Sequence, residues 1–185
     1  VSVFVNPIQF GPNEDLESYP RDLEADAKLC ESTGADIIFN PEPEEMYADG
    51  FVSFINMTGL PNALCGLTRP IHFKGVCTVV GKLFNIVTPD RAYFGQKDAQ
   101  QLAIIMRMVK DLNFDIEIVG CPIIREEDGL AKSSRNIYLT PEERKAAVVL
   151  SKAVKLGQDM IADGERDAAK IVGEMKKLIS AEPLA

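Results

Sequence analysis

Residues 91–119, RAYFGQKDAQQLAIIMRMVKDLNFDIEIV, contain the segment that decides the fold. Residues 91–94 predict a short strand that leads directly into Gly95. Residues 99–112 predict a helix whose apolar stripe is Leu102, Ile105, Met106 and Val109. Residues 115–119 predict the next strand. A strand, a helix and a strand at this short spacing are typical of a parallel sheet with helices on both faces, which is an α/β fold.

The same alternation continues on both sides of this segment. Further strands are predicted at residues 1–5, 36–39 and 51–57, and a helix at 22–32. Residues 73–87 are apolar on nearly every face, which predicts a helix buried against a sheet or in a subunit interface.

The pattern changes after Pro122. Residues 140–143, TPEE, form a capping box with Pro at the first helical position, and the helix that it opens extends toward residue 162. A further helix is predicted at about residues 167–180. We therefore expect one α/β domain over residues 1–122 and the start of a second domain over residues 123–185.

Composition excludes several classes of function. The net charge is −8, whereas a nonspecific nucleic-acid binder needs clustered Lys and Arg. No apolar run reaches the roughly 18 residues of a membrane span. The four cysteines form no Cys-x-x-Cys pair, as expected of a reduced cytoplasmic protein. The chain opens without Met inside an apolar run, so we expect that an upstream part is missing.

Two polar loops are the strongest candidates for chemistry. The first, Gly95-Gln96-Lys97-Asp98, lies between a strand and a helix, where free N–H groups and a Lys suit phosphate and where Asp98 is placed to cap the helix. The second, Lys132-Ser133-Ser134-Arg135-Asn136, combines hydroxyls with two cations that can hold a polyphosphate. Spacing alone leaves open a plain turn at either place, and no Walker A or Gly-x-Gly-x-x-Gly motif occurs.

Two amides follow the first predicted strand. Asn6 and Gln9 can orient a polar substrate without adding charge, although a strand-ending turn explains them equally well. His72 is the only histidine, and it has no second candidate ligand nearby. A structural role for His72 is favoured over a catalytic one, and a His-based metal site or triad has little support.

Six motifs, taken in order, resemble the pantothenate synthetase (pantoate–β-alanine ligase) family. They are VNPIQFGPNED (5–15), YPRD (19–22), RPIHFKGV (69–76), KLFN (82–85), PDRAYFGQKD with QQL (89–102), and REEDGLA with SSRN (125–136). The resemblance implies a Rossmann-like domain of nucleotidyltransferase type and a smaller C-terminal α+β lid domain, truncated here. It also implies a homodimer with no nucleic-acid or membrane partner.

The resemblance further implies a reaction and its site residues. Pantoate attacks ATP, with Mg²⁺, to give pantoyl adenylate and pyrophosphate, and β-alanine then displaces AMP. Pantoate is expected at Gln9, Gln101, Asn6 and Arg69, and β-alanine at Gln9. ATP is expected at Gly95, Gln96, Lys97, Asp98, Ile124, Lys132, Ser133, Ser134 and Arg135, of which Lys97, Ser133 and Arg135 are the candidate catalytic residues.

The chain departs from the family pattern in three ways. The family's His-x-Gly-His segment, whose first His acts on the ATP phosphate, has no counterpart in this sequence. Lys132 stands where Leu or Met is frequent, and Gln96 where Glu is common. A catalytically idle dimerisation or binding module, suggested by residues 73–87, and a different adenylyl transferase on the same fold remain the alternatives.

Overall fold

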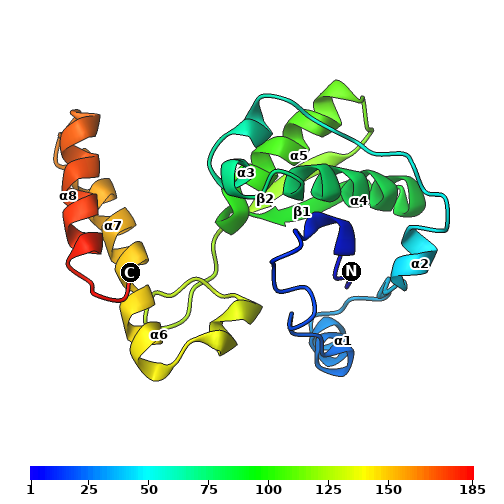
Figure 1. The fold of residues 1–185 in the computed structure, drawn as a ribbon, viewed down its shortest axis with the longest axis horizontal. Helices are drawn as coiled ribbons and strands as arrows, with labels where there is room; N and C mark the ends of the chain where they lie inside the picture. Colours follow the sequence, from blue (N-terminus) through cyan, green and yellow to red (C-terminus); the bar gives the residue numbers. More distant parts are fainter. The chain divides into compact units, whose positions relative to one another are not determined.

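A computed structural model describes residues 1–185, and the chain divides into two compact units, Val1–Pro122 and Ile123–Ala185. Each unit is described by itself (Figure 1). The first unit contains α1 (Leu23–Ser32), α2 (Pro43–Met46), α3 (Cys65–Thr68), α4 (His72–Val87), β1 (Arg91–Gly95), α5 (Ala99–Asp111) and β2 (Glu117–Cys121). It also has 3₁₀ turns at Pro7–Gln9, Leu60–Asn62 and Gln96–Asp98. The second unit contains a 3₁₀ turn at Ser134–Tyr138 and three helices, α6 (Pro141–Ala147), α7 (Val149–Ala162) and α8 (Ala168–Ser180).

The predicted strand–helix–strand unit is present. Strands β1 and β2 pair in parallel, in a register that runs from Arg91 opposite Glu117 to Gly95 opposite Cys121, and α5 connects them. Side chains alternate along β1, so Ala92 and Phe94 face the core whereas Tyr93 is exposed. The α/β fold class is confirmed, and Gly95 stands at the carboxyl end of β1, where ligands bind in such sheets.

Helix α4 forms the centre of the first unit's core. Ten of its residues are buried, and Phe73, Val76, Cys77, Val80 and Phe84 pack with Ile104, Ile105 and Met108 of α5. The predicted helix at residues 73–87 is confirmed. Its buried apolar residues pack within the unit, whereas Ile86 and Val87 at its end are exposed. On α5 the buried face is shifted from the predicted stripe, because Met106 is exposed while Ile104 and Met108 are buried.

The strands predicted at residues 1–5, 36–39 and 51–57 are wrong. The first two segments form a single parallel bridge between Ser2 and Phe39, beside which the Val1 amino group donates to Ile37 O, and residues 51–57 form no ladder. Residues 51–57 are instead held by the Ile55 N–H, which donates to Thr78 Oγ1 of α4 at 3.0 Å. Apolar and β-branched residues indicate burial against a core, but a strand also requires a neighbouring backbone to pair with.

The second unit is mainly helical, with a short hairpin before its first turn. Thr140 and Glu143 form the predicted capping box at the start of α6, with Pro141 at the first helical position. The single helix predicted up to residue 162 is two helices, since α6 ends at Ala147 and α7 begins at Val149. Helices α7 and α8 pack closely at Gly157, where an added Cβ would lie 2.8 Å from Met175 Sδ.

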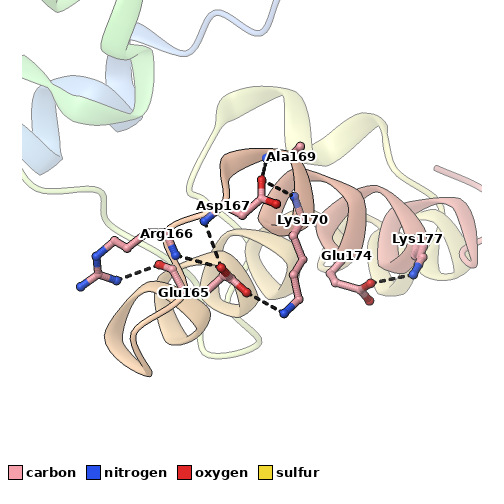
Figure 2. A network of polar contacts seen from close by, with 7 residues as sticks. All are labelled: Glu165, Arg166, Asp167, Ala169, Lys170, Glu174 and Lys177. Carbon is pink, nitrogen blue, oxygen red and sulfur yellow. Dashed lines mark hydrogen bonds and ion pairs between the residues drawn. The ribbon is translucent and has the colours of Figure 1, made fainter.

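A polar network closes the turn between α7 and α8 (Figure 2). Glu165 Oε1 accepts from the N–H groups of Arg166 and Asp167 at 2.9 and 3.0 Å, and Glu165 Oε2 lies 2.6 Å from Lys170 Nζ. Asp167 Oδ1 then caps α8 by accepting from the Ala169 and Lys170 N–H groups. The Lys170 hydrogen bond, with the two backbone donors, lowers the pKa of Glu165 to about 2. No helix of either unit is long and apolar enough to cross a membrane.

Candidate functional site

Asn6 is the most deeply buried of the predicted site residues, at 3% exposed. Its Nδ2 donates to Gly75 O of α4 and to Gln9 Oε1, both at 3.1 Å. Its Oδ1 accepts from the Tyr47 hydroxyl at 2.7 Å. Because a buried amide is costly unless its hydrogen bonds are satisfied, these three contacts fix both the position and the orientation of the Asn6 side chain.

The backbone of Gln9 lies directly against the first turns of α4. A Cβ added to Gly75 would be 2.5 Å from Gln9 Cα and 2.6 Å from Gln9 N, so only glycine permits this approach. His72 Nδ1 lies 3.1 Å from Gln9 O. A carbonyl oxygen only accepts, so Nδ1 carries the proton, and burial lowers the pKa of His72 below its usual value. His72 is therefore a neutral structural residue that holds Gln9.

One group of the Gln9 side-chain amide has no hydrogen-bond partner within the chain. Its Oε1 accepts from Asn6, whereas its Nε2 makes no hydrogen bond within the chain. The residue is half-buried, so the two Nε2 N–H groups form a donor pair at the surface of a rigid turn. Such a pair suits an oxygen acceptor, for example a carboxylate.

Arg69 is held by an acidic partner that the sequence did not indicate. Its Nε donates to Glu14 Oε1 at 2.9 Å and its Nη2 to Glu14 Oε2, and the two side chains are only 25% and 22% exposed. This bidentate pair lowers the pKa of Glu14 and raises that of Arg69. Arg69 therefore has a neutralising partner and is less available to a substrate anion than a free cation would be.

Gln100 and Gln101 differ in their surroundings although they are adjacent at the start of α5. Gln100 Nε2 donates to Leu60 O and Ala63 O, and its Oε1 accepts from the Cys65 N–H. Gln100 thus ties residues 60–65 to α5. The Gln101 side chain is half-buried and makes no hydrogen bond within the chain, so its amide is available to a ligand.

The loop at residues 95–98 is exposed beyond the end of β1. Gly95 has ordinary extended backbone angles, and the nearest atom to an added Cβ is Lys97 N at 4.0 Å. Asp98 precedes α5, but its side chain makes no capping hydrogen bond, so the predicted cap is wrong. The Asp98 carboxylate is instead 3.4 Å from Lys97 Nζ, a separation at which the two charges attract without a tight bond.

The second polar loop belongs to the second unit and follows a hairpin. Ile124 O accepts from the Lys132 N–H at 3.0 Å, and the backbones of Arg125 and Ala131 form an antiparallel β-bridge. Ser133 Oγ accepts from the Arg135 N–H at 3.3 Å, which opens the 3₁₀ turn that begins at Ser134. The Lys132 ammonium lies 4.0 Å from Glu126, and the side chains of Lys132, Ser134 and Arg135 are exposed.

The first unit brings part of the predicted site together. Asn6, Gln9 and His72 form one cluster in the first unit, whereas residues 95–98 and 132–135 belong to different units. Sequence reasoning missed Tyr47, Glu14 and Gln100, which hold Asn6, Arg69 and the 60–65 segment. A surface groove of about 810 Å³, lined by residues 55–60 and by the end of α5, contains none of the predicted site residues.

Comparison with known proteins identifies the family. The model of the family described as "Pantoate-beta-alanine ligase" matches residues 1–185. The chain belongs to the pantoate–β-alanine ligase family. The resemblance that the six motifs carry is therefore confirmed.

Curated members of this ligase family are similar along the whole chain. A pantothenate synthetase of Ruminiclostridium cellulolyticum is 66% identical over 185 residues, and one of Clostridium acetobutylicum is 64% identical over 185 residues. Both comparisons cover all of this chain and 66% of the relative. The chain therefore spans about two thirds of the length of the ligases that it matches.

Solved ligase structures share the fold. The crystal structure of the Thermus thermophilus enzyme has a TM-score of 0.96 and 50% sequence identity, over 98% of this chain and 66% of that one. A Francisella tularensis pantoate–β-alanine ligase has a TM-score of 0.79 and 34% identity, over 96% and 66% of the two chains. That structure is described as complexed with "Beta-gamma ATP and Beta-alanine".

The side chains that commonly bind metal ions do not form a metal site in this chain. No group of three or more His, Cys, Asp or Glu side chains converges on a point where a metal ion could be held. Magnesium that accompanies a nucleotide is coordinated mainly by phosphate oxygens and water, with one or two carboxylates. We therefore treat the expected Mg²⁺ as part of the nucleotide substrate.

Proposed function

We propose that the chain is part of an enzyme that condenses pantoate with β-alanine at the expense of ATP. The observation that carries the proposal is the Asn6–Gln9 turn, which is fixed against α4 and leaves the Nε2 N–H groups of Gln9 without a partner within the chain. Membership of the ligase family supports the same substrates, and so does the Francisella relative described with "Beta-gamma ATP" and β-alanine.

The proposed reaction has two steps. A carboxylate oxygen of pantoate attacks the α-phosphorus of ATP, the bond to the β-phosphate oxygen breaks, and magnesium pyrophosphate leaves. The β-alanine amine then attacks the acyl carbon, the bond from carbon to the AMP oxygen breaks, and the amine loses a proton. No covalent enzyme intermediate is needed, so the protein has to position the reactants and neutralise charge on the transferring phosphorus.

Each group of residues has one part in this proposal. Gln9 and Gln101 donate to oxygens of pantoate, with Asn6 fixing Gln9, and Gln9 also lies beside β-alanine. The exposed loop at residues 95–98 binds ATP, and the absence of a side chain at Gly95 keeps its backbone open to the nucleotide. In the second unit, Ser133 and Arg135 bind phosphate together with the backbone of Ile124 and the side chains of Lys132 and Ser134. Because Arg69 is paired with Glu14, its contribution to pantoate binding is indirect.

Calorimetric titration of the chain with pantoate tests the binding half of the proposal. We expect saturable binding that weakens by about 10- to 100-fold in Gln9→Ala and Gln101→Ala, because a hydrogen bond to a charged group is worth about 1.5–3 kcal/mol. The affinity for MgATP should change little in both variants. Gln158→Ala removes an exposed amide from α7 in the other unit and is the matched control. Pantoate binding that is equal in all four proteins would exclude this site.

The adenylate step has its own isotopic test. Pantoate labelled with ¹⁸O in its carboxylate should transfer one labelled oxygen to AMP, because the bond broken in the second step is the acyl carbon–oxygen bond. Mass spectrometry of AMP from a reaction with pantoate, β-alanine and MgATP reads the label. Unlabelled AMP, formed together with pantothenate, would rule out the pantoyl adenylate. The homodimer that the resemblance implies stays a prediction, which sedimentation equilibrium can check.

A further inference from the structure

Tyr47 stands at the far end of the hydrogen bonds that lead to Gln9. It follows α2 in the sequence, and its hydroxyl donates to Asn6 Oδ1 at 2.7 Å, the shortest contact of the Asn6 amide. The ring is enclosed by Phe4 and Phe51, with centroid distances of 6.5 and 5.1 Å, and Lys82 Nζ lies 6.0 Å from its centroid. The packing around the ring therefore fixes where the hydroxyl points.

The direction of each hydrogen bond follows from Gly75. Its carbonyl oxygen only accepts, so the Nδ2 end of the Asn6 amide must face it. The Oδ1 end then faces Tyr47, whose hydroxyl must donate. Burial raises the pKa of Tyr47 to about 12, so the hydroxyl keeps its proton throughout the neutral range.

The second Nδ2 proton of Asn6 completes the chain of bonds. It is donated to Gln9 Oε1, which turns the Gln9 oxygen inward and the Nε2 group outward. The reversed Gln9 amide would place its own N–H groups against the Asn6 N–H groups, and two donors repel. The Gly75 carbonyl thus sets the polarity that Gln9 presents to a ligand. The Tyr47 hydroxyl, 41 residues from Asn6 in the sequence, occupies the Oδ1 end and holds the Asn6 amide in that orientation.

We propose that Tyr47 is a positioning residue, which acts through Asn6 to fix the Gln9 amide with its N–H donors toward the bound acid. This rests on the proposed function insofar as pantoate is the acid. The arrangement selects a carboxylate or hydroxyl oxygen at Gln9 and rejects an ammonium or amide N–H group at the same point.

Tyr47→Phe removes the hydroxyl and keeps the ring. We expect the dissociation constant for pantoate to rise about 5- to 10-fold by calorimetry, because one neutral hydrogen bond that orders the site is lost. The dissociation constant for MgATP should stay the same. The Asn6 side-chain N–H groups, followed by ¹⁵N NMR in the protein without ligand, should exchange with water faster. Tyr93→Phe removes an exposed hydroxyl in the same unit and should change none of these values.

The outcomes separate this role from the alternatives. Unchanged pantoate affinity and unchanged Asn6 exchange in Tyr47→Phe would overturn it. Equal weakening of pantoate and MgATP binding, together with a large fall in melting temperature, would also overturn it, since Tyr47 would then be only structural. Failure of the wild-type chain to bind pantoate would refute the proposed function instead. In that case the Asn6 exchange rates alone decide whether Tyr47 orders the amides.

Discussion

Gly75→Ala is the substitution that most directly tests the contact between Gln9 and α4. The added methyl group would lie 2.5 Å from Gln9 Cα, 2.6 Å from Gln9 N and 2.6 Å from Ile8 O. All three atoms belong to the backbone, so no side-chain rotation can relieve the clash. The turn and the helix would have to separate by about 0.9 Å to restore ordinary contact at 3.4 Å.

Three terms contribute to the change in the free energy of unfolding in Gly75→Ala. Overpacking of this kind costs about 1–3 kcal/mol. Separation also stretches the Asn6–Gly75 and His72–Gln9 hydrogen bonds, which are worth about 1 kcal/mol each. Alanine is favoured over glycine within a helix by about 1 kcal/mol, which offsets part of this loss. We expect a net destabilisation of about 2–4 kcal/mol.

Gly81→Ala is a matched control in the same helix. It has the same gain in helix propensity, but its added methyl group meets the end of the Ile55 side chain, which can rotate away. We expect a change of about 1 kcal/mol or less, given the partial offset by propensity. Urea unfolding read by hydrogen exchange of peptides from His72–Val87 gives both values. Gly75→Ala as stable as Gly81→Ala would refute the close contact.

Three further predictions concern other parts of the chain. Gly95→Ala should change stability by less than about 0.5 kcal/mol, since its backbone angles suit alanine, and should weaken MgATP binding by calorimetry. The folded-state pKa of Glu14 is lowered, so its bond to Arg69 stabilises the fold above about pH 4.5 and is lost as pH falls through the lowered pKa. Glu14→Gln should therefore cost about 1–2 kcal/mol at pH 7, and the cost should fall as pH is lowered below 4.5, measured by urea unfolding. Thr140→Ala should cost about 1 kcal/mol and Thr140→Ser much less, measured by hydrogen exchange in α6.

The sequence predicted those elements whose signals are local. The strand–helix–strand segment and α4 are marked by periodicity within a dozen residues, and the start of α6 is marked by Thr140, Pro141 and Glu143. The strands predicted in the first 57 residues failed because pairing depends on a distant backbone. Residues 1–5 pair with the backbone only at Ile37 and Phe39, which is too short a contact for a strand.

The candidate site, like the fold, was predictable only where its signals are local in the sequence. The motifs indicated Asn6 and Gln9, and the resemblance added Gln101. The partners that hold site residues lie far away in sequence, since Tyr47 is 41 residues from Asn6 and Glu14 is 55 residues from Arg69. No local pattern distinguishes such residues from any other Tyr or Glu. Gln100 and Gln101 have different surroundings because successive side chains of an α-helix point about 100° apart. This rotation places the Gln100 side chain against residues 60–65.

The most direct test of the account follows the Gln9 side-chain amide during a pantoate titration. In ¹⁵N-labelled protein, the two Nε2 proton signals of Gln9 should move downfield and saturate with the dissociation constant obtained by calorimetry, because both donors face the bound carboxylate. The Gln158 amide in α7 should not move. If pantoate binds while the Gln9 signals stay in place, the donor pair at Gln9 is not the pantoate site and the account is wrong.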